Sequence, residues 1–220
     1  MRQEARRAIF LDRDGVINAL VYRPEEGVYD SPYSLEELRL LPGAAEAIRQ
    51  INALGWLAVV VSNQPGVAKG KCDHAFLDQV TDKMREELAR QGAHLDGVYY
   101  CRHHPKAVVA ELRVACECRK PRPGLLLEAA RAHGVDLAAS YMVGDKLSDV
   151  EAGRAAGCKT ILVGGALDRQ GGTGGPRPDW LAGDLLEAVG VIQVQEGRGG
   201  DLHRLGEPVG DQAVAGVRCS

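Results

Sequence analysis

Two aspartates, Asp12 and Asp14, follow the apolar run at residues 8–11, and Gly15 comes directly after them. Positions i and i+2 of an extended chain lie on the same side, so both carboxyl groups can point into one site beyond the end of a strand. One carboxylate could attack and form a covalent intermediate, while the other handles the proton. A strand-end turn with two solvated aspartates is the alternative interpretation of this segment.

A second polar group, Ser62, Asn63 and Gln64, follows the apolar run at residues 57–61, and Gly66 comes shortly after it. Hydroxyl, amide and backbone N–H groups at the end of a strand suit a phosphate group. We therefore take Ser62 as a candidate catalytic residue and the two amides as candidate substrate contacts. An ordinary Asn-Pro-Gly-type turn explains the same residues without a ligand.

Two fixed cations, Arg119 and Lys120, stand just before Pro123 and Gly124, where a helix is predicted to begin. Arginine can bind a phosphate through two hydrogen bonds, and lysine is a compact charge that offsets the negative charge of phosphoryl transfer. A solvated basic turn is the simpler alternative.

Asp145 follows Gly144 at the end of another apolar run, and Lys146 comes next. Magnesium binds oxygen ligands and commonly takes one or two protein carboxylates, with water and substrate phosphate completing its shell. Asp12 and Asp145 can supply these carboxylates, and Lys146 is a candidate substrate contact. A strand-to-helix turn with a capping aspartate is the alternative, and Asp149 lies either beside the metal site or simply on the helix.

Four further residues, Cys101, His103, Cys116 and Cys118, form two ligand pairs joined by a loop. Three thiolates and one imidazole make a closed tetrahedral zinc site. A disulfide or free thiols are the alternative, which the expected reducing compartment disfavours. His104 is expected at the surface, and three cysteines fit no ligand pattern: Cys72, Cys158 and Cys219.

Short apolar runs that are typical of buried parallel strands alternate with amphipathic stretches that are typical of helices. The pattern predicts strands at 8–11, 57–61, 98–100, 141–143 and 160–163, and helices at 43–54, 73–92, from 124 onward, at 148–156 and at 184–189. This alternation predicts a doubly wound α/β fold with a parallel sheet. Such sheets bind ligands at the carboxyl ends of their strands, so the motifs are expected to converge.

Taken together, these motifs resemble the signature motifs of the haloacid-dehalogenase-like phosphatases over roughly residues 8–191. The Cys-x-His pair followed by Cys-x-Cys-Arg-Lys-Pro is similar to the family of heptose bisphosphate and histidinol phosphate phosphatases. The resemblance implies a Rossmann-like sheet with a small zinc-binding loop at 101–118, a structural zinc ion and no large cap domain.

The resemblance also implies roles for single residues. Asp12 matches the nucleophile of the family, and Asp14 matches its general acid and base. The magnesium ligands of the family match Asp12, the backbone carbonyl of Asp14, and Asp145. The hydroxyl and the lysine that stabilise the phosphoryl group match Ser62 and Lys120.

Arg119 matches the substrate-recognising arginine of the family, and Arg13, between the two aspartates, is a further candidate substrate contact. The chain departs from the family pattern at Pro65, where a serine is usual, and at Lys69, where an arginine is usual. The loop after Asn18 is also longer than is typical.

The 220 residues fit one domain at 1–194, and residues 195–220 lack periodicity and are expected to be a disordered tail. The net charge of −3 gives no global attraction to nucleic acid or to an anionic membrane. No apolar run approaches the length of a bilayer span, and no signal peptide is evident. We therefore expect a cytoplasmic monomer. Residues 22–38 are expected to form a lid or binding loop.

The sequence thus predicts a magnesium-dependent phosphomonoesterase that acts through an aspartyl phosphate. The resemblance implies that it acts on a small phosphorylated sugar, with the 7-phosphate of a heptose bisphosphate as the expected target. Histidinol phosphate, a nucleic-acid 3′-phosphate or another small ester are alternatives with the same chemistry. A zinc-stabilised binding protein with a degenerate site is an alternative of another class. The intact set of Asp12, Asp14, Lys120 and Asp145 argues against it.

Overall fold

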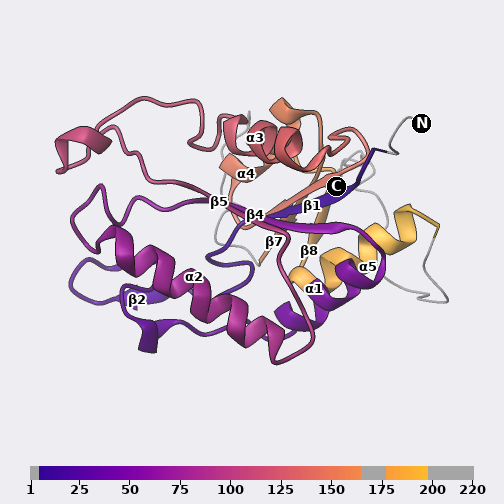
Figure 1. Cartoon of the computed structure of the whole chain (residues 1–220), viewed down its shortest axis with the longest axis horizontal. Helices are drawn as coiled ribbons and strands as arrows, with labels where there is room; N and C mark the ends of the chain where they lie inside the picture. Colours follow the sequence, from indigo (N-terminus) through magenta and orange to yellow (C-terminus); the bar gives the residue numbers. More distant parts are fainter. Residues whose placement is uncertain (1–4, 165–176, 198–220) are drawn as a thin grey trace, which may run out of the picture.

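The computed structural model describes residues 5–164 and 177–197, and these residues are built around one six-stranded sheet (Figure 1). The order of the strands across the sheet is β5-β4-β1-β6-β7-β8, and each neighbouring pair is parallel. The bounds are β1 Ala8–Leu11, β4 Leu57–Asn63, β5 Gly97–Cys101, β6 Tyr141–Gly144, β7 Lys159–Val163 and β8 Trp180–Ala182.

Helices cover both faces of this sheet (Figure 1). On one face lie α1 (Ala44–Ala53), α2 (His74–Ala89) and α5 (Leu185–Gln195), and on the other lie α3 (Gly124–His133) and α4 (Leu147–Ala156). Side chains of β1 alternate between these layers, because successive strand residues point to opposite faces. Ile9 and Leu11 enter the core cluster of the first face, and Ala8 and Phe10 that of the second. The doubly wound α/β prediction is confirmed.

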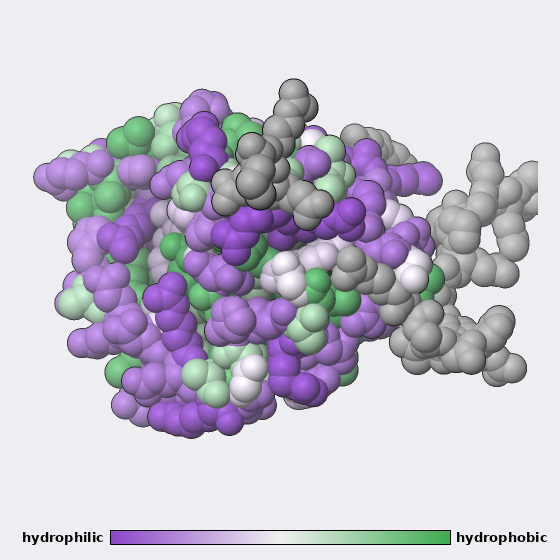
Figure 2. Space-filling model, turned by 45° about the vertical axis from the view of Figure 1, so that its right-hand side comes forward, coloured by the Kyte–Doolittle hydropathy of each residue, from purple (hydrophilic) through white to green (hydrophobic). Residues whose placement is uncertain are grey.

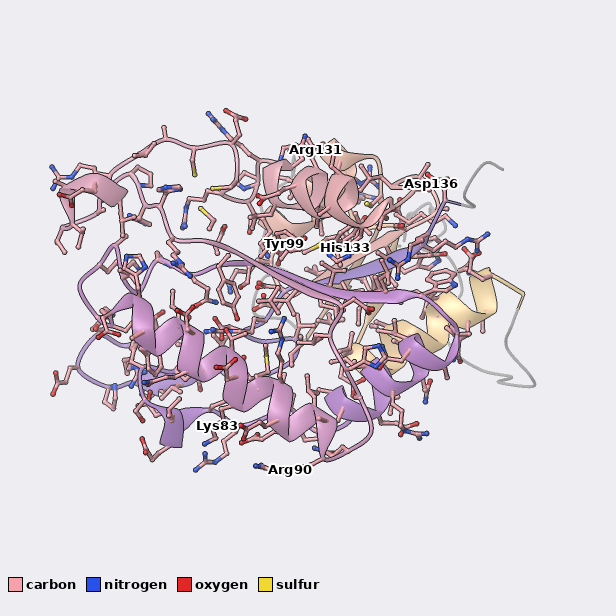
Figure 3. All side chains as sticks on the ribbon, viewed as in Figure 1. Lys83, Arg90, Tyr99, Arg131, His133 and Asp136 are labelled. Carbon is pink, nitrogen blue, oxygen red and sulfur yellow. The ribbon has the colours of Figure 1, made fainter. Side chains whose placement is uncertain are left out.

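β5 and α3 are also joined by a polar contact beneath the second layer. The hydroxyl of Tyr99 lies 3.0 Å from Nε2 of His133, and the two rings meet edge to face. Figure 3 shows these two labelled side chains turned toward one another between β5 and the end of α3. This contact fixes the helix that begins just after the Arg119-Lys120 segment.

A second, two-stranded sheet overlaps residues 22–38, for which the sequence predicts a lid or binding loop. β2 (Val21–Arg23) and β3 (Val28–Asp30) form an antiparallel hairpin, followed by the short 3-10 helix η1 (Leu35–Glu37). The sequence analysis missed this hairpin because its strands are only three residues long and none of their residues is buried, so they lack an apolar period. Residues 101–118 carry only the short 3-10 helix η2 (Ala110–Leu112) beyond the end of β5, and the described residues include no large cap domain.

Several boundaries differ from those predicted. β4 runs on to Asn63, because Ser62 and Asn63 still pair with Tyr100 and Cys101 of β5. β8 was not predicted; a strand of three residues owes its conformation to pairing with β7.

The C-terminal helix is also longer than predicted. α5 continues to Gln195, where 184–189 was predicted, and the next residue, Glu196, accepts hydrogen bonds from Arg7, Tyr141 and Lys159. The domain edge placed at residue 194 was therefore too early. The remainder of the predicted tail, 198–220, lies outside the described residues, as do residues 165–176.

Figure 2 shows one face of the molecule, on which polar residues predominate and hydrophobic residues gather only in small spots. Within 5–164 and 177–197, no helix combines the length and the apolar character that crossing a membrane requires.

Candidate active site

The sheet brings three of the predicted motifs to one edge. β1 lies between β4 and β6, so Asp12 comes out between the end of β4, which carries Ser62, and the end of β6, which precedes Asp145. The backbone N–H of Asp12 donates to the carbonyl of Val143 at 3.0 Å, which continues the β1–β6 pairing by one residue. The expected convergence at the carboxyl ends of the strands therefore occurs.

Lys120 reaches this edge from the loop between β5 and α3. Its Nζ lies 2.9 Å from Oδ1 of Asp12 and 2.6 Å from Oδ1 of Asp149, and it donates to the carbonyl of Val61 at 2.8 Å. Burial, which leaves 3% of the residue exposed, lowers the pKa of Lys120, but the charges of Asp12 and Asp149 raise it above its ordinary value. Lys120 is thus a permanent cation beside the predicted nucleophile.

Asn63 fixes the backbone of this lysine. Its amide nitrogen donates to the carbonyl of Lys120, and its amide oxygen accepts from the N–H of Lys120, both at 3.0 Å. Asn63 was predicted as a substrate contact, but both polar atoms of its side chain are already used to hold Lys120.

Three carboxylates form an acidic cluster at the same place. Asp12, Asp145 and Asp149 each offer an oxygen within 4.8 Å of the others. Burial raises the pKa of Asp145 to about 7; the Lys146 ammonium opposes this shift, and the charges of Asp12 and Asp149 add to it. Gly15 has a φ of +86°, and a Cβ at this position would overlap the carboxyl group of Asp145. The glycine therefore allows the close approach of the two loops.

This donor set fits a hard divalent cation. Among the residues that the structure describes, these three carboxylates pair with one buried cation, Lys120, and one half-exposed cation, Lys146. An Mg²⁺ ion would offset the remaining negative charge with the oxygen ligands it prefers. Asp149 is already committed, because its Oδ1 pairs with Lys120 and its Oδ2 accepts the Lys146 N–H that caps α4. Asp12 and Asp145 are left as the carboxylates that can hold the metal.

Asp14 is buried and accepts five hydrogen bonds. Oδ1 accepts from Arg13 Nε at 3.0 Å and from Asn18 Nδ2 at 2.9 Å. Oδ2 accepts from Arg13 Nη2 at 3.1 Å, Gln64 Nε2 at 2.7 Å and Ser31 Oγ at 2.8 Å. Burial raises the pKa of Asp14, but the Arg13 charge and the bonds from Gln64, Asn18 and Ser31 bring it below the ordinary value.

Two residues predicted as substrate contacts are instead part of this support. Arg13 and Gln64 are 1% and 2% exposed, and Arg13 Nη2 also donates to Gln64 Oε1 at 2.8 Å. Arg13 Nε and Nη2 and Gln64 Nε2 donate to Asp14 in the interior, and the burial of both residues leaves little surface for a substrate. Lys146, by contrast, is half exposed and lies 3.3 Å from Asp145.

Three residues of the site were not assigned from the sequence: Asn18, Ser31 and Asp149. Asp149 gave a signal, since it lies three residues after the helix-capping position of Lys146, where an acidic side chain can accept the capping N–H. The sequence holds no comparable signal for Asn18 and Ser31, because each contacts Asp14 only once the chain after β1 has folded.

The four predicted zinc ligands also come together. Cys101 ends β5, and its Sγ lies 3.5 Å from that of Cys116 and 3.3 Å from that of Cys118; Nδ1 of His103 lies 3.4 Å from Cys118 Sγ. All three cysteines are free, and these distances are far longer than a disulfide bond of about 2.05 Å.

The chemistry of this cluster fits zinc. Burial raises the pKa of Cys101 and Cys118, and neighbouring thiols reinforce the shift at Cys118. Three thiols and one imidazole are the S₃N donor set that tetrahedral zinc sites use, and a divalent cation would stabilise the thiolates. His104 stands outside the cluster, where its Nδ1 accepts the N–H of Lys106.

The cysteine loop carries the basic segment of the site. Cys118 directly precedes Arg119, whose Nη1 donates to the carbonyl of His103 at 3.2 Å, and Lys120 follows. The loop therefore helps to position both cations, together with the contacts of Asn63 to the backbone of Lys120.

Comparison with known proteins gives consistent matches. The family model described as HAD-hydrolase-like matches residues 117–188. The D-glycero-beta-D-manno-heptose-1,7-bisphosphate 7-phosphatase of Salmonella typhi is 38% identical over 197 residues, which cover 86% of this chain and 96% of that protein. The enzyme of the same name from Escherichia coli K12 is 39% identical over 193 residues, covering 86% and 95%.

Solved structures agree with these relatives. The D,D-heptose 1,7-bisphosphate phosphatase of B. bronchiseptica, in complex with magnesium and phosphate, has a TM-score of 0.72 and 35% identity, covering 86% of this chain and 99% of that one. The corresponding enzyme of Burkholderia thailandensis has a TM-score of 0.60 and 28% identity, covering 84% and 96%.

Proposed function

Because this chain belongs to the heptose bisphosphate phosphatase family of haloacid-dehalogenase-like hydrolases, we propose that it removes the 7-phosphate of D-glycero-D-manno-heptose 1,7-bisphosphate. The observation that carries the proposal is the position of Asp12, which lies between the buried cation Lys120 and the carboxylate of Asp145, with Asp14 two residues away. This arrangement supports Asp12 as the nucleophile, Lys120 as the charge stabiliser and Asp145 as a metal ligand, with Asp14 as the proton carrier.

In the first step, an oxygen of Asp12 attacks the phosphorus of the 7-phosphate. The bond between this oxygen and phosphorus forms as the bond between phosphorus and the sugar oxygen breaks. Asp14, in the protonated minor form that its lowered pKa leaves, gives its proton to the departing sugar oxygen. The products of this step are the sugar alcohol and a phosphorylated Asp12.

In the second step, Asp14 takes a proton from a water molecule that attacks the same phosphorus. The bond from phosphorus to Asp12 breaks, inorganic phosphate leaves, and Asp14 regains its proton for the next cycle. One pair of carboxylates therefore serves both half-reactions.

Lys120 and Ser62 stabilise the negative charge that spreads over the phosphoryl oxygens. Asp12, Asp145 and the backbone carbonyl of Asp14 would hold Mg²⁺, which supplies Lewis-acid stabilisation of the same charge when bound. Asp149 keeps the ammonium of Lys120 near Asp12.

Basic residues near Lys120 support a substrate with a second anionic group, because Arg119 directly precedes Lys120. Burial lowers the pKa of His104, and the charges of Arg119, Lys69 and Lys106 lower it further. We infer that Arg119 contacts the part of the substrate beyond the transferred phosphate. Zinc would be structural and would hold the loop that presents Arg119 and Lys120.

A steady-state panel tests this proposal. The purified protein with Mg²⁺ is assayed on both anomers of heptose 1,7-bisphosphate, on histidinol phosphate and on a 3′-phosphorylated oligonucleotide, with Asp12→Asn as the inactive control. We expect the highest kcat/KM for a heptose bisphosphate and no measurable turnover by Asp12→Asn. Higher efficiency on another ester would overturn the substrate, and activity of Asp12→Asn within tenfold of the wild type would overturn the covalent mechanism. A cytoplasmic location and a monomeric state stay predictions.

A further inference from the structure

The carboxylate of Asp14 receives one hydrogen bond from outside the central sheet and its adjoining loops. Arg13 and Asn18 belong to the loop after β1, and Gln64 directly follows β4. The remaining partner, Ser31, belongs to residues 21–37, which we call the flap segment and which comprise the β2–β3 hairpin, the residues after it and η1. The flap segment therefore reaches the proposed proton carrier directly.

All three polar groups of Ser31 are bonded. Its hydroxyl donates to Oδ2 of Asp14 at 2.8 Å, its N–H donates to Oδ1 of Asp30 at 2.9 Å, and its carbonyl accepts from Nη2 of Arg23 at 2.9 Å. The two backbone bonds fix the position from which the hydroxyl points at Asp14.

Ion pairs fix Arg23 and Asp30, the two residues that hydrogen-bond to the backbone of Ser31. Arg23 makes two bonds to the carboxylate of Glu37, at 2.6 and 2.8 Å, which join β2 to η1. Lys71, from the loop after β4, pairs with Glu26 at 2.8 Å and with Asp30 at 3.1 Å. The flap segment is thus closed on itself and tied to the loop that follows β4.

The far end of the flap segment is attached as well. Lys83 of α2 donates to the carbonyl of Leu35 in η1 at 2.7 Å, and Figure 3 shows Lys83 at the lower edge of α2. The attachments at Glu26, Asp30 and Leu35 make the segment a fixed platform for Ser31.

Ser31 differs chemically from the other partners of Asp14. The guanidinium of Arg13 and the amide nitrogens of Asn18 and Gln64 can only donate, whereas a hydroxyl both donates and accepts. When Asp14 carries the proton on Oδ2, a rotated Ser31 hydroxyl can accept it in a hydrogen bond; when Asp14 has given the proton away, the hydroxyl donates again. Among the described partners in their present orientation, only Ser31 suits both states.

We propose that Ser31 is a positioning residue for the proton-transfer carboxylate of Asp14, and that the ion pairs of the flap segment keep Ser31 in place. The inference rests on the proposed role of Asp14 as general acid and base. Ser31 itself gains and loses no proton overall; its hydroxyl only reverses direction as the proton of Asp14 passes to the sugar oxygen.

The test compares leaving groups. A sugar alkoxide needs the proton of Asp14, whereas p-nitrophenolate is a weak base that leaves readily without it. Single-turnover rates of leaving-group release are measured with enzyme in excess over heptose bisphosphate and over p-nitrophenyl phosphate. In Ser31→Ala we expect the rate to fall about tenfold to hundredfold on the sugar and less than about threefold on the aryl ester. Ser31→Thr, which keeps the hydroxyl, should restore the sugar rate.

Ser34→Ala is the matched control, since it removes a hydroxyl from the same segment without a bond to Asp14, and both of its rates should stay near those of the wild type. If Ser31→Ala does not fold, Lys71→Met decides instead, because it removes the ion pairs with Glu26 and Asp30 while keeping the hydroxyl. It should lower the sugar rate more than the aryl rate. Equal losses on both esters, or no loss on the sugar, would overturn the inference.

Asp14→Asn separates this inference from the proposed mechanism. A much greater loss on the sugar than on the aryl ester in Asp14→Asn, together with equal losses in Ser31→Ala, would reject the role of Ser31 alone. No preferential loss in Asp14→Asn would reject the role of Asp14 and the inference with it.

Discussion

The ammonium of Lys120 lies 2.6 Å from Oδ1 of Asp149, at the start of α4, and this ion pair is almost completely buried. The same ammonium lies 2.9 Å from Asp12. Asp149 therefore acts on the site through Lys120, and it directs the cation that stabilises charge at the predicted nucleophile.

Replacing Asp149 tests this relationship. Asp149→Asn keeps an acceptor for the Lys146 N–H but removes the charge that holds Lys120, so we expect kcat to fall roughly tenfold to hundredfold. Steady-state kinetics and circular dichroism are the measurements, and the spectrum should match the wild type. Asp149→Ala, which also removes the cap, should melt at a lower temperature than Asp149→Asn. An unchanged kcat in Asp149→Asn would mean that Asp12 and the carbonyl of Val61 suffice to hold Lys120.

Magnesium binding should depend on pH through Asp145. Burial raises the pKa of this carboxyl to about 7 in the metal-free protein, and Mg²⁺ binds the ionised form, so the metal affinity should weaken by up to about tenfold per pH unit below 7. Without metal, Asp145 stabilises the folded protein at low pH rather than at high pH, because the folded state binds its proton more tightly than the unfolded state does. This contribution to the free energy of unfolding is fully present below the unfolded pKa of about 4 and is lost as the pH rises through the folded pKa of about 7.

Thermal melts with and without Mg²⁺ at pH 5.5 and pH 8 measure this effect. The increase in Tm on adding Mg²⁺ should be clearly larger at pH 8, and Asp145→Asn should show little increase at either pH. An increase of equal size at both pH values in the wild type would contradict the assignment of Asp145 as a ligand.

Zinc content tests the cysteine cluster. We expect one zinc ion per chain by elemental analysis of protein purified without chelator, and none in the double variant Cys116→Ser, Cys118→Ser. The double variant should also lose most activity, because metal binding supplies folding energy to the loop that carries Arg119 and Lys120. Cys72→Ser, outside the cluster, should keep its zinc. Zinc retained by the double variant would refute the ligand set.

A variant of Arg119 tests whether this residue recognises the substrate. Arg119→Ala should lower kcat/KM for heptose bisphosphate by about tenfold to hundredfold, as expected for one lost charged hydrogen bond, and should affect p-nitrophenyl phosphate much less. Arg122→Ala is a suitable control, because Arg122 lies in the same turn but is exposed and paired with Glu117. Equal losses on both esters would assign Arg119 to the phosphoryl site or to the loop instead.

The sequence by itself determined the sheet class, the residues at its carboxyl edge and the four residues of the cysteine cluster. These features are local. An apolar run predicts a buried strand, and the types of the residues directly after it indicate the chemistry of the site, as at Asp12, Ser62 and Asp145. The stop signal of α4 is equally local, since Gly157 adopts a φ of +88°.

Only the tertiary structure decided which polar side chains are free to contact a substrate and which hold Asp14 or Lys120 in place. Arg13, Asn63 and Gln64 looked like substrate contacts because their types can bind phosphate, but their hydrogen bonds go to Asp14 and Lys120. Asp149 could be a helix cap or a part of the site, and it is both. Ser31 meets Asp14 only because a hairpin without an apolar period folds back over the sheet edge. Such pairings depend on contacts between distant segments, which local residue patterns do not encode.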